Sequence, residues 1–236
     1  MTDQRQILET HKKKNPSEIP QIFVPYKETL DIYDAGLRVP DDITLVWPDD
    51  NYGYMKRVSN DVERQRKGGS GIYYHLSYLG TPHDYLWIST APPMLMYEEL
   101  KKAYDAGADR YWLLNVGDIK PMEIGMQQFF DMAWDLSAFT YENVNRYQPQ
   151  WLASLYGKQH QKDFQQILDQ YYRLAWQRKP EFMGYEMEWD NDENNRLHDT
   201  DFSFGNGTAQ QRLADYKAIS DRVDVIQKTL PAEFRP

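Results

Sequence analysis

Carboxylates, amides, tyrosines and a histidine follow short apolar runs at four places in the first half of this 236-residue chain. The candidate site residues are Glu28, Asp49, Asn51, Tyr73, His75 and Asn115. Carboxyl groups can transfer protons, whereas amides and hydroxyls can bind the hydroxyl groups of a substrate. Their repeated position after apolar runs predicts that these residues converge in one cavity.

The acidic segment Trp47-Pro-Asp-Asp-Asn-Tyr-Gly-Tyr54 is the strongest local motif. A plain turn is the usual outcome for an Asp-Asn cluster. The aromatic side chains around this acidic tip are less usual, and they resemble a carbohydrate site, in which rings stack on the sugar while carboxylates bind hydroxyls. Asp49 and Asn51 are therefore candidates for acid–base work and for substrate binding, respectively.

Two further motifs have both a structural and a functional interpretation. Strand alternation places Tyr73, His75 and Ser77 on one face, where the histidine is either a hydrogen-bonded structural residue or part of a site. In the next motif, Asp118 is expected to cap a helix, whereas Asn115 is expected to bind substrate hydroxyls. Lys120, close behind, would then lie near an anionic group.

Strands and helices alternate through this first half. Runs rich in β-branched and aromatic residues predict strands near residues 21–25, 43–47, 72–77 and 111–116. Helix-like spacing predicts helices over residues 28–37, 58–67, 94–106 and 122–134, with Pro121 at the first helical position and a loop over residues 68–71. Such β/α units keep their chemistry at the carboxyl ends of the strands.

The second half has a different pattern. Apolar residues at helix spacing predict helices over residues 141–156, 161–178 and 210–228, and no strand pattern follows residue 136. The acidic segment 186–207 is expected to be a loop, and residues 1–19 a short helix or a disordered lead-in. The sequence therefore predicts a β/α domain over residues 1–136 and a helical domain over residues 137–236.

The number of β/α units indicates an incomplete fold. Four units are half of a (β/α)8 barrel, which needs eight units and about 250 residues. A parallel sheet of four strands would also leave two exposed edges. We therefore expect the C-terminal half of a (β/α)8 barrel followed by an all-α domain, in a piece of a longer protein or a chain that pairs with another.

Composition excludes several classes of function. A net charge of −9 argues against duplex nucleic acid as the main partner. The chain has no cysteine, no apolar run long enough to span a membrane, and no apolar secretory segment at its N-terminus. Metal-ligand spacing, a phosphate-binding glycine loop and a serine nucleophile elbow are absent from the sequence, so we expect no metal and no cofactor.

Taken together, the four motifs resemble glycoside hydrolase family 115, the xylan α-1,2-glucuronidases. The matching stretches are VPYKETLDIYDAGLRVPDDITLVWPDDNYGYMKR, GGSGIYYHLSYLGTPHDYLWIST and YWLLNVGDIKP. The likeness is dense from about residue 20 to residue 136 and looser beyond. It implies an inverting hydrolase, several times longer than this chain, that removes glucuronic acid or its 4-O-methyl ether from O2 of xylose in glucuronoxylan.

The resemblance also implies roles for individual residues. Glu28 resembles the proposed general acid, and Asp49 is a candidate for the second carboxylate, which inversion places roughly 6.5–9.5 Å away. Asn51 belongs to the same acidic turn, Tyr73 and His75 to the strand that faces the sugar, and Asn115 to the last barrel strand. No arginine lies at any of the four strand ends, so the cation for the uronate is expected in the other half of the barrel.

The implied partner is glucuronoxylan or its oligosaccharides, and a homodimer is an open alternative for the full-length parent. The parent is expected to be secreted or periplasmic, and the chain alone is expected to be inactive. One rival interpretation is a non-catalytic carbohydrate-binding or structural remnant of such an enzyme. A second is a stand-alone α/β domain that binds an anionic metabolite.

Overall fold

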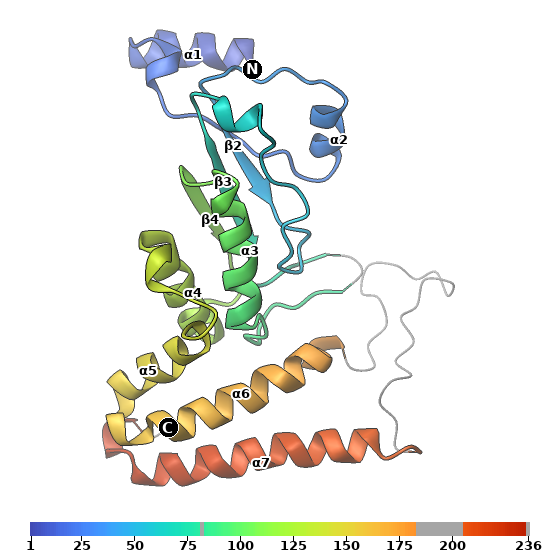
Figure 1. Cartoon of the computed structure of the whole chain (residues 1–236), viewed down its shortest axis with the longest axis vertical. Helices are drawn as coiled ribbons and strands as arrows, with labels where there is room; N and C mark the ends of the chain where they lie inside the picture. Colours follow the sequence, from blue (N-terminus) through green and yellow to red (C-terminus); the bar gives the residue numbers. More distant parts are fainter. Residues whose placement is uncertain (81–82, 183–204, 235–236) are drawn as a thin grey trace. The chain divides into compact units, whose positions relative to one another are not determined.

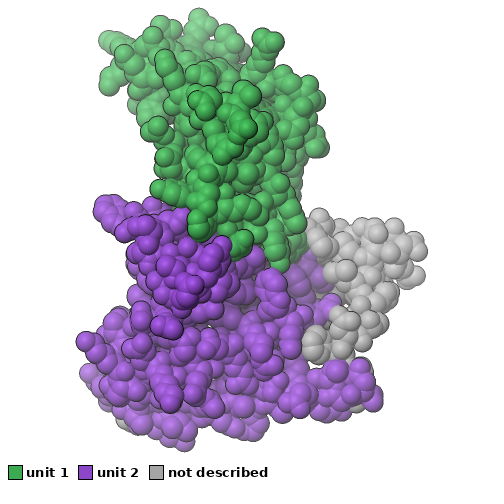
Figure 2. All heavy atoms as spheres, in the orientation of Figure 1, with its two compact units in different colours: residues 1–75, 98–115 green, residues 76–97, 116–236 purple. Residues whose placement is uncertain are grey.

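The computed structural model describes residues 1–80, 83–182 and 205–234. Within these ranges the chain combines a parallel four-stranded sheet with helices (Figure 1), as the predicted α/β class requires. Contacts divide the chain into two compact units, Met1–His75 with Glu98–Asn115 and Leu76–Tyr97 with Val116–Pro236 (Figure 2). The domain boundary predicted at residue 136 stays a prediction.

The first unit holds the whole sheet, in the strand order β1-β2-β3-β4. The strands are β1 (Ile22–Phe23), β2 (Thr44–Pro48), β3 (Ser70–His75) and β4 (Tyr111–Asn115). All neighbouring strands are parallel, and the register pairs Pro48 with Tyr73 and His75 with Asn115. The carboxyl ends of β2, β3 and β4 therefore bring the predicted site residues to one edge of the sheet.

Helices occupy most of the remaining described residues. The α-helices are α1 (Thr2–Lys12), α2 (Glu28–Asp34), α3 (Pro93–Asp105), α4 (Ile119–Trp134), α5 (Val144–Tyr156), α6 (Gln161–Gln177) and α7 (Thr208–Thr229). Short 3-10 turns are η1 (Pro16–Glu18), η2 (Glu63–Gln65), η3 (Leu136–Ala138), η4 (Lys158–His160), η5 (Pro180–Phe182) and η7 (Ala232–Phe234). The described residues after 136 contain helices and no strand, as their apolar spacing predicted.

The core of the first unit is built from the central strands. Leu45, Val46 and Trp47 of β2 are fully buried, and so are Ile72 and Tyr74 of β3. A strand buried on both faces needs a continuous apolar run, and β2 supplies one. The polar edge of its indole is satisfied, because Trp47 Nε1 donates to Ser59 Oγ at 2.8 Å. This core fixes the strand ends that carry the site.

The loop predicted over residues 68–71 is shorter than expected, because β3 already begins at Ser70. A Cβ atom at Gly71 would lie 2.0 Å from the Tyr111 carbonyl oxygen of β4. The glycine therefore marks a close approach of two strand backbones and not the interior of a loop.

The charged helix predicted over residues 58–67 is wrong, since only η2 forms there. The Asn60 side chain accepts hydrogen bonds from the backbone N–H groups of Val62 and Glu63, at 3.0 and 2.9 Å. Such side-chain bonds compete with a continuous helix. Glu63 is also buried against Arg57, so the segment is not the solvated helix that its charge suggested.

The next helix begins earlier than predicted. The helix α4 begins at Ile119, directly after Asp118. Pro121 is therefore its third residue and not its first. Asp118 makes no side-chain hydrogen bond to the helix end, contrary to the expected cap. Proline is tolerated in this first turn, where its missing N–H has no helical partner to lose.

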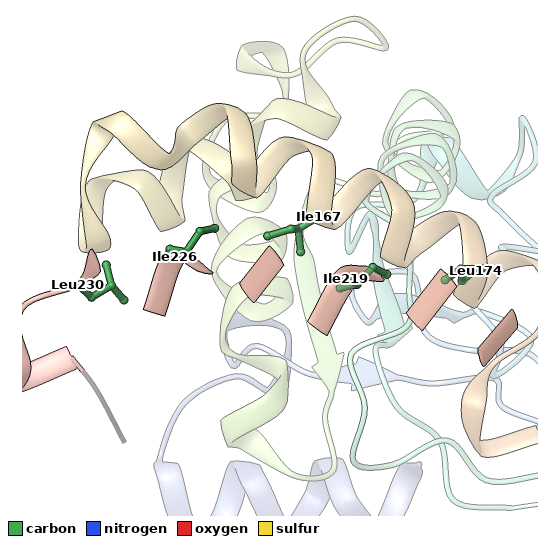
Figure 3. Packing of buried hydrophobic residues seen from close by; sticks show 5 residues of the cluster. All are labelled: Ile167, Leu174, Ile219, Ile226 and Leu230. Atoms are coloured by element: carbon green, nitrogen blue, oxygen red, sulfur yellow. The ribbon is translucent and has the colours of Figure 1, made fainter. Parts of the chain in front are cut away.

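Helices α6 and α7 of the second unit pack antiparallel. Arg212 near the start of α7 donates to the carbonyl oxygen of Leu174 near the end of α6, at 3.1 Å. Their shared apolar cluster comprises Ile167, Leu174, Ile219, Ile226 and Leu230 (Figure 3). Ile167 and Leu174 lie seven residues apart on α6, as do Ile219 and Ile226 on α7, which is two helical turns on one face. Leu230 directly follows the end of α7. Most of the acidic segment 186–207 lies outside the described residues.

Candidate active site

A tight acidic turn follows β2. The Asp49 carboxylate accepts the backbone N–H groups of Asn51 at 3.0 Å and of Gly53 at 3.1 Å. The Asp50 carboxylate also stabilises this turn, because it accepts hydrogen bonds from the backbone N–H groups of Tyr52 at 3.0 Å and of Tyr54 at 3.1 Å. These local side-chain bonds hold the turn rigid without further secondary structure.

Asp49 and His75 form a buried pair at the ends of β2 and β3. His75 Nδ1 lies 2.5 Å from Asp49 Oδ1, and the His75 backbone N–H donates to Asp49 Oδ2 at 3.0 Å. The side chain of His75 is 1% exposed, and that of Asp49 is 0% exposed. The two contacts to one carboxylate, from the ring and from the backbone of His75, fix the orientation of the ring. An ionised carboxylate can only accept, and Nδ1 is then the donor of the ring contact.

Four hydrogen bonds therefore converge on the Asp49 carboxylate, two on each oxygen. A carboxylate offers about four lone-pair positions, so its acceptor capacity is filled. The geometry makes Asp49 a group that holds the turn and the histidine in place. Its predicted role as a catalytic carboxylate stays a prediction.

Tyr73 and Asn115 extend this arrangement to β4. Asn115 Nδ2 donates to the Tyr73 hydroxyl at 2.6 Å, across neighbouring strands. The rings of Tyr73 and His75 lie 4.6 Å apart, centroid to centroid. The side chains of β3 and β4 therefore present one polar and aromatic surface at the carboxyl end of the sheet.

Tyr26, from the segment after β1, completes the cluster. Its hydroxyl donates to Asn51 Oδ1 at 2.7 Å. Its ring lies 6.1 Å from the ring of His75, stacked at 26°, and 5.9 Å from the ring of Tyr73, edge-on. Five of the six predicted site residues are thus joined in one network, and Tyr26 is the member that sequence reasoning missed. Its place beside Glu28, at a strand end already singled out, was the available signal.

Glu28, the sixth predicted residue, is the exposed first residue of α2. In the described part of the chain its side chain has no hydrogen bond or ion pair, so it is not joined to the network. It follows Lys27, whose backbone is unusual, with φ 51° and ψ −126°. Asn51 also has a positive φ, of 75°. Such backbone conformations cost free energy and cluster at functional sites, which fits these two segments.

Arg57, the first arginine after the acidic turn in the sequence, has a structural role. The Arg57 guanidinium binds both carboxylate oxygens of Glu63, at 2.6 and 2.9 Å, and stacks over the Trp47 ring. Burial raises the pKa of Glu63, but the hydrogen bonds and charge of Arg57, together with hydrogen bonds from the Asn60 backbone and the Tyr33 hydroxyl, hold that pKa below its usual value. The guanidinium of Arg57 is therefore already used in packing and pairing with Glu63 and Trp47.

The described residues contain no group of three or more histidine, cysteine, aspartate or glutamate side chains that could hold a metal ion. Among the same residues, no helix is both long enough and apolar enough to cross a membrane.

Comparison with known proteins gives the context of this cluster. The family model of glycosyl hydrolase family 115 matches residues 1–182. A solved 4-O-methyl-α-glucuronidase of that family, described as specific for decorated arabinogalactans, superposes with a TM-score of 0.91 at 45% sequence identity. The similarity covers 98% of this chain and 30% of that one. No curated protein matches the chain. With three quarters of its length matched by the family model, the chain belongs to glycosyl hydrolase family 115.

Proposed function

We propose that this chain supplies part of the active site of an α-glucuronidase, a hydrolase that releases glucuronic acid or its 4-O-methyl ether from a polysaccharide. The observation that carries the proposal is the single network of Tyr26, Asp49, Asn51, Tyr73, His75 and Asn115 at the carboxyl ends of parallel strands. Amides, phenols and an oriented imidazole suit the hydroxyl groups and the ring faces of a sugar.

Glu28 is the proposed general acid. Its carboxyl group is exposed and has no protein partner within the described ranges, so a proton can be exchanged with solvent and given to a leaving oxygen. Inversion requires a second carboxylate that activates water, at roughly 6.5–9.5 Å. Because the acceptor capacity of Asp49 is filled, we propose that it acts through His75 and the acidic turn, and that another carboxylate of the longer enzyme is the base.

The proposed substrate class is a polysaccharide with α-linked (4-O-methyl-)glucuronic acid branches. Glucuronoxylan is the first candidate, implied by the resemblance of the sequence to the xylan α-1,2-glucuronidases. Decorated arabinogalactan is the second candidate, supported by the 45% identity to an enzyme described as specific for it. Both substrates carry the same uronic acid, so the network would bind the branch in either case and other residues would choose the main chain.

The sheet is proposed to be half of a (β/α)8 barrel. Its strand order follows the chain, and β1 and β4 each have an edge without a partner strand among the described residues. Unpaired edges bind further strands, and a barrel removes both edges at once. This chain spans 30% of the length of the solved relative, which leaves room there for the remaining strands. Export from the cytoplasm and a homodimer are proposed for the longer protein only.

A chimera tests the proposal. The matching segment of the solved relative is replaced by this chain, and release of uronic acid is measured on glucuronoxylan and on decorated arabinogalactan. We expect activity on at least one of them, with the β-anomer as the first product seen by NMR, as inversion of an α-linkage requires. The control for a Glu28→Gln change in the chimera is Asp31→Asn, which alters an exposed carboxylate on the same helix.

The rival interpretation is a non-catalytic carbohydrate-binding remnant. It predicts a folded chimera that binds oligosaccharides but releases no uronic acid from either substrate. A folded chimera with neither binding nor hydrolysis would contradict both interpretations.

A further inference from the structure

A groove between the end of α4 and the start of α5 lies within the second unit and has no role in the site described above. It encloses about 450 Å³, within the range of small-molecule sites. Its lining combines one exposed indole with carboxylates, amides and one guanidinium; the residues that matter here are Trp134, Asp135, Phe139, Arg146, Tyr147 and Gln150.

Trp134 is the most informative residue of this groove. Its side chain is 92% exposed, the largest exposure among the large apolar residues of the described chain. An indole in that state contributes almost no burial to folding, whereas burying one apolar face is worth about 25 cal/mol per Å². Beside it, the groove floor is firm, because Phe139 is buried and its ring lies 5.5 Å from that of Tyr147.

The polar groups of the groove differ in how far they are already satisfied. Asp131 accepts hydrogen bonds from Tyr147 and, at 2.9 Å, from Gln127. Asp135 binds Ser137 through Oδ1 alone, at 2.6 and 3.0 Å. In the described residues, the guanidinium of Arg146 and the amide of Gln150 make no side-chain hydrogen bond or ion pair. The groove therefore offers the Asp135 carboxylate as an acceptor, and the Gln150 amide and the Arg146 guanidinium as further hydrogen-bonding groups. All three line the same groove as the exposed indole of Trp134.

We propose that this groove is an ancillary binding site for a neutral pyranose of a polysaccharide main chain. The indole of Trp134 stacks on the apolar face of the sugar, and Asp135, Arg146 and Gln150 exchange hydrogen bonds with its hydroxyl groups. Two carboxylates and one guanidinium leave the groove with a formal charge of −1, which favours a neutral sugar over a uronate. The choice of a polysaccharide as ligand rests on the proposed function.

The test uses the complete 236-residue chain and follows the indole N–H signal of Trp134 by NMR, assigned with Trp134→Phe. Neutral xylo-oligosaccharide and galacto-oligosaccharide are titrated separately, followed by the same oligosaccharides with glucuronic acid branches. We expect at least one neutral oligosaccharide to shift the signal with millimolar affinity, and the branched form to bind no more tightly. Trp134→Ala and Arg146→Gln should each weaken binding by about fivefold or more.

Trp176→Ala is the matched control, because Trp176 is 60% exposed on α6 and lies outside the groove. An unchanged Trp134 signal with every oligosaccharide would overturn the proposal, as would an equal loss of binding in the control. Sedimentation velocity supplies a further decision: if Trp134→Ala turns a dimer into a monomer, the indole belongs to an interface between copies and the sugar site is wrong.

Failure of this proposal and failure of the proposed function are separable. An inactive but folded chimera whose Trp134 signal responds to neutral sugar would remove the glucuronidase and keep the groove. An active chimera whose Trp134 signal is unresponsive would do the reverse.

Discussion

At the scale of single residues, the two carboxylates proposed for the site lie in opposite environments. Asp49 is buried and fully hydrogen-bonded, whereas Glu28 is exposed and unattached in the described chain. Proton transfer needs a group that can change its protonation state during the reaction. Exposure and lack of partners therefore favour Glu28 for chemistry, and saturation favours Asp49 for positioning.

Replacing Glu28 by glutamine tests the first role. In the chimera we expect Glu28→Gln to lower the hydrolysis of polysaccharide by about 10²–10⁴-fold, because the amide keeps the shape but cannot give a proton. Oligosaccharide binding should be nearly unchanged. An aryl glucuronide should lose less activity, since its leaving group needs little protonation. An equal loss on both substrates would instead indicate a binding role or misfolding.

Replacing Asp49 by asparagine tests the second role. The new amide group must point its N–H₂ at donors on one side, which leaves buried donors without an acceptor. We expect Asp49→Asn to lower the free energy of unfolding by about 2–4 kcal/mol, measured by urea denaturation of the complete chain. The control Asp31→Asn should change it by less than about 0.5 kcal/mol. Equal stability of Asp49→Asn and the parent would argue against the positioning role.

At the scale of elements, the packing of α6 on α7 allows a paired test. Ile226 is 7% exposed in the shared cluster (Figure 3), whereas its neighbour Val225 is 64% exposed. We expect Ile226→Ala to lower the free energy of unfolding by about 2–4 kcal/mol. Val225→Ala should change it by less than about 0.5 kcal/mol. Similar losses in chemical denaturation would contradict the assigned faces.

The segment before η5 supplies a pH-dependent element. Burial lowers the pKa of Lys179 to about 8, while its ammonium group donates to Thr90 at 2.9 Å and lies over the Tyr85 ring. An unfolded lysine keeps its usual pKa near 10.4, so between these two values the unfolded chain binds more protons than the folded one. The contribution of Lys179 to stability therefore increases as pH rises from about 8 to 10.

The measurement compares the complete chain with Lys179→Met in urea at pH 7 and at pH 10. The stability of the parent relative to the variant should rise by about 2–3 kcal/mol over this interval. Groups that titrate in both proteins cancel in the difference. A constant difference would show that the ammonium group is solvated.

The accuracy of the sequence interpretation also varies by element. The strands β2 and β3 were predictable because apolar and aromatic runs mark strands that are buried in a parallel sheet. The run in β4 is of the same kind, although its residues are exposed or half-buried. Residues 58–67 were misassigned because their many charges suggested a solvated helix. In the structure, Glu63 is instead buried in an ion pair with Arg57. In the candidate site, five of the six residues that were predicted from their positions at strand ends are joined in one network. The contribution of Tyr26 depends on how the segment after β1 folds over the sheet edge, which periodicity does not encode.

At the scale of the whole molecule, the chain carries one connected part of a larger proposed site. The uronate would be expected to bind a cation, and Arg57, the first arginine after the acidic turn in the sequence, is already paired with Glu63. We expect no release of uronic acid above background from glucuronoxylan or decorated arabinogalactan by the 236-residue chain alone. Clear release by the purified chain, measured by chromatography of the products, would mean that the site is complete.

The strand order of the sheet, which follows the order of the chain, also has a consequence for biosynthesis. Each strand pairs with the one that left the ribosome before it, so the sheet can extend at one edge as the chain emerges and no strand waits for a later partner. The strands span residues 22–115. At translation rates of about 5–20 residues per second, their synthesis takes on the order of 5–20 s, far longer than a helix or a loop needs to form. The sheet, and with it the network at the carboxyl ends of its strands, is therefore suited to assembly from the N-terminus during translation.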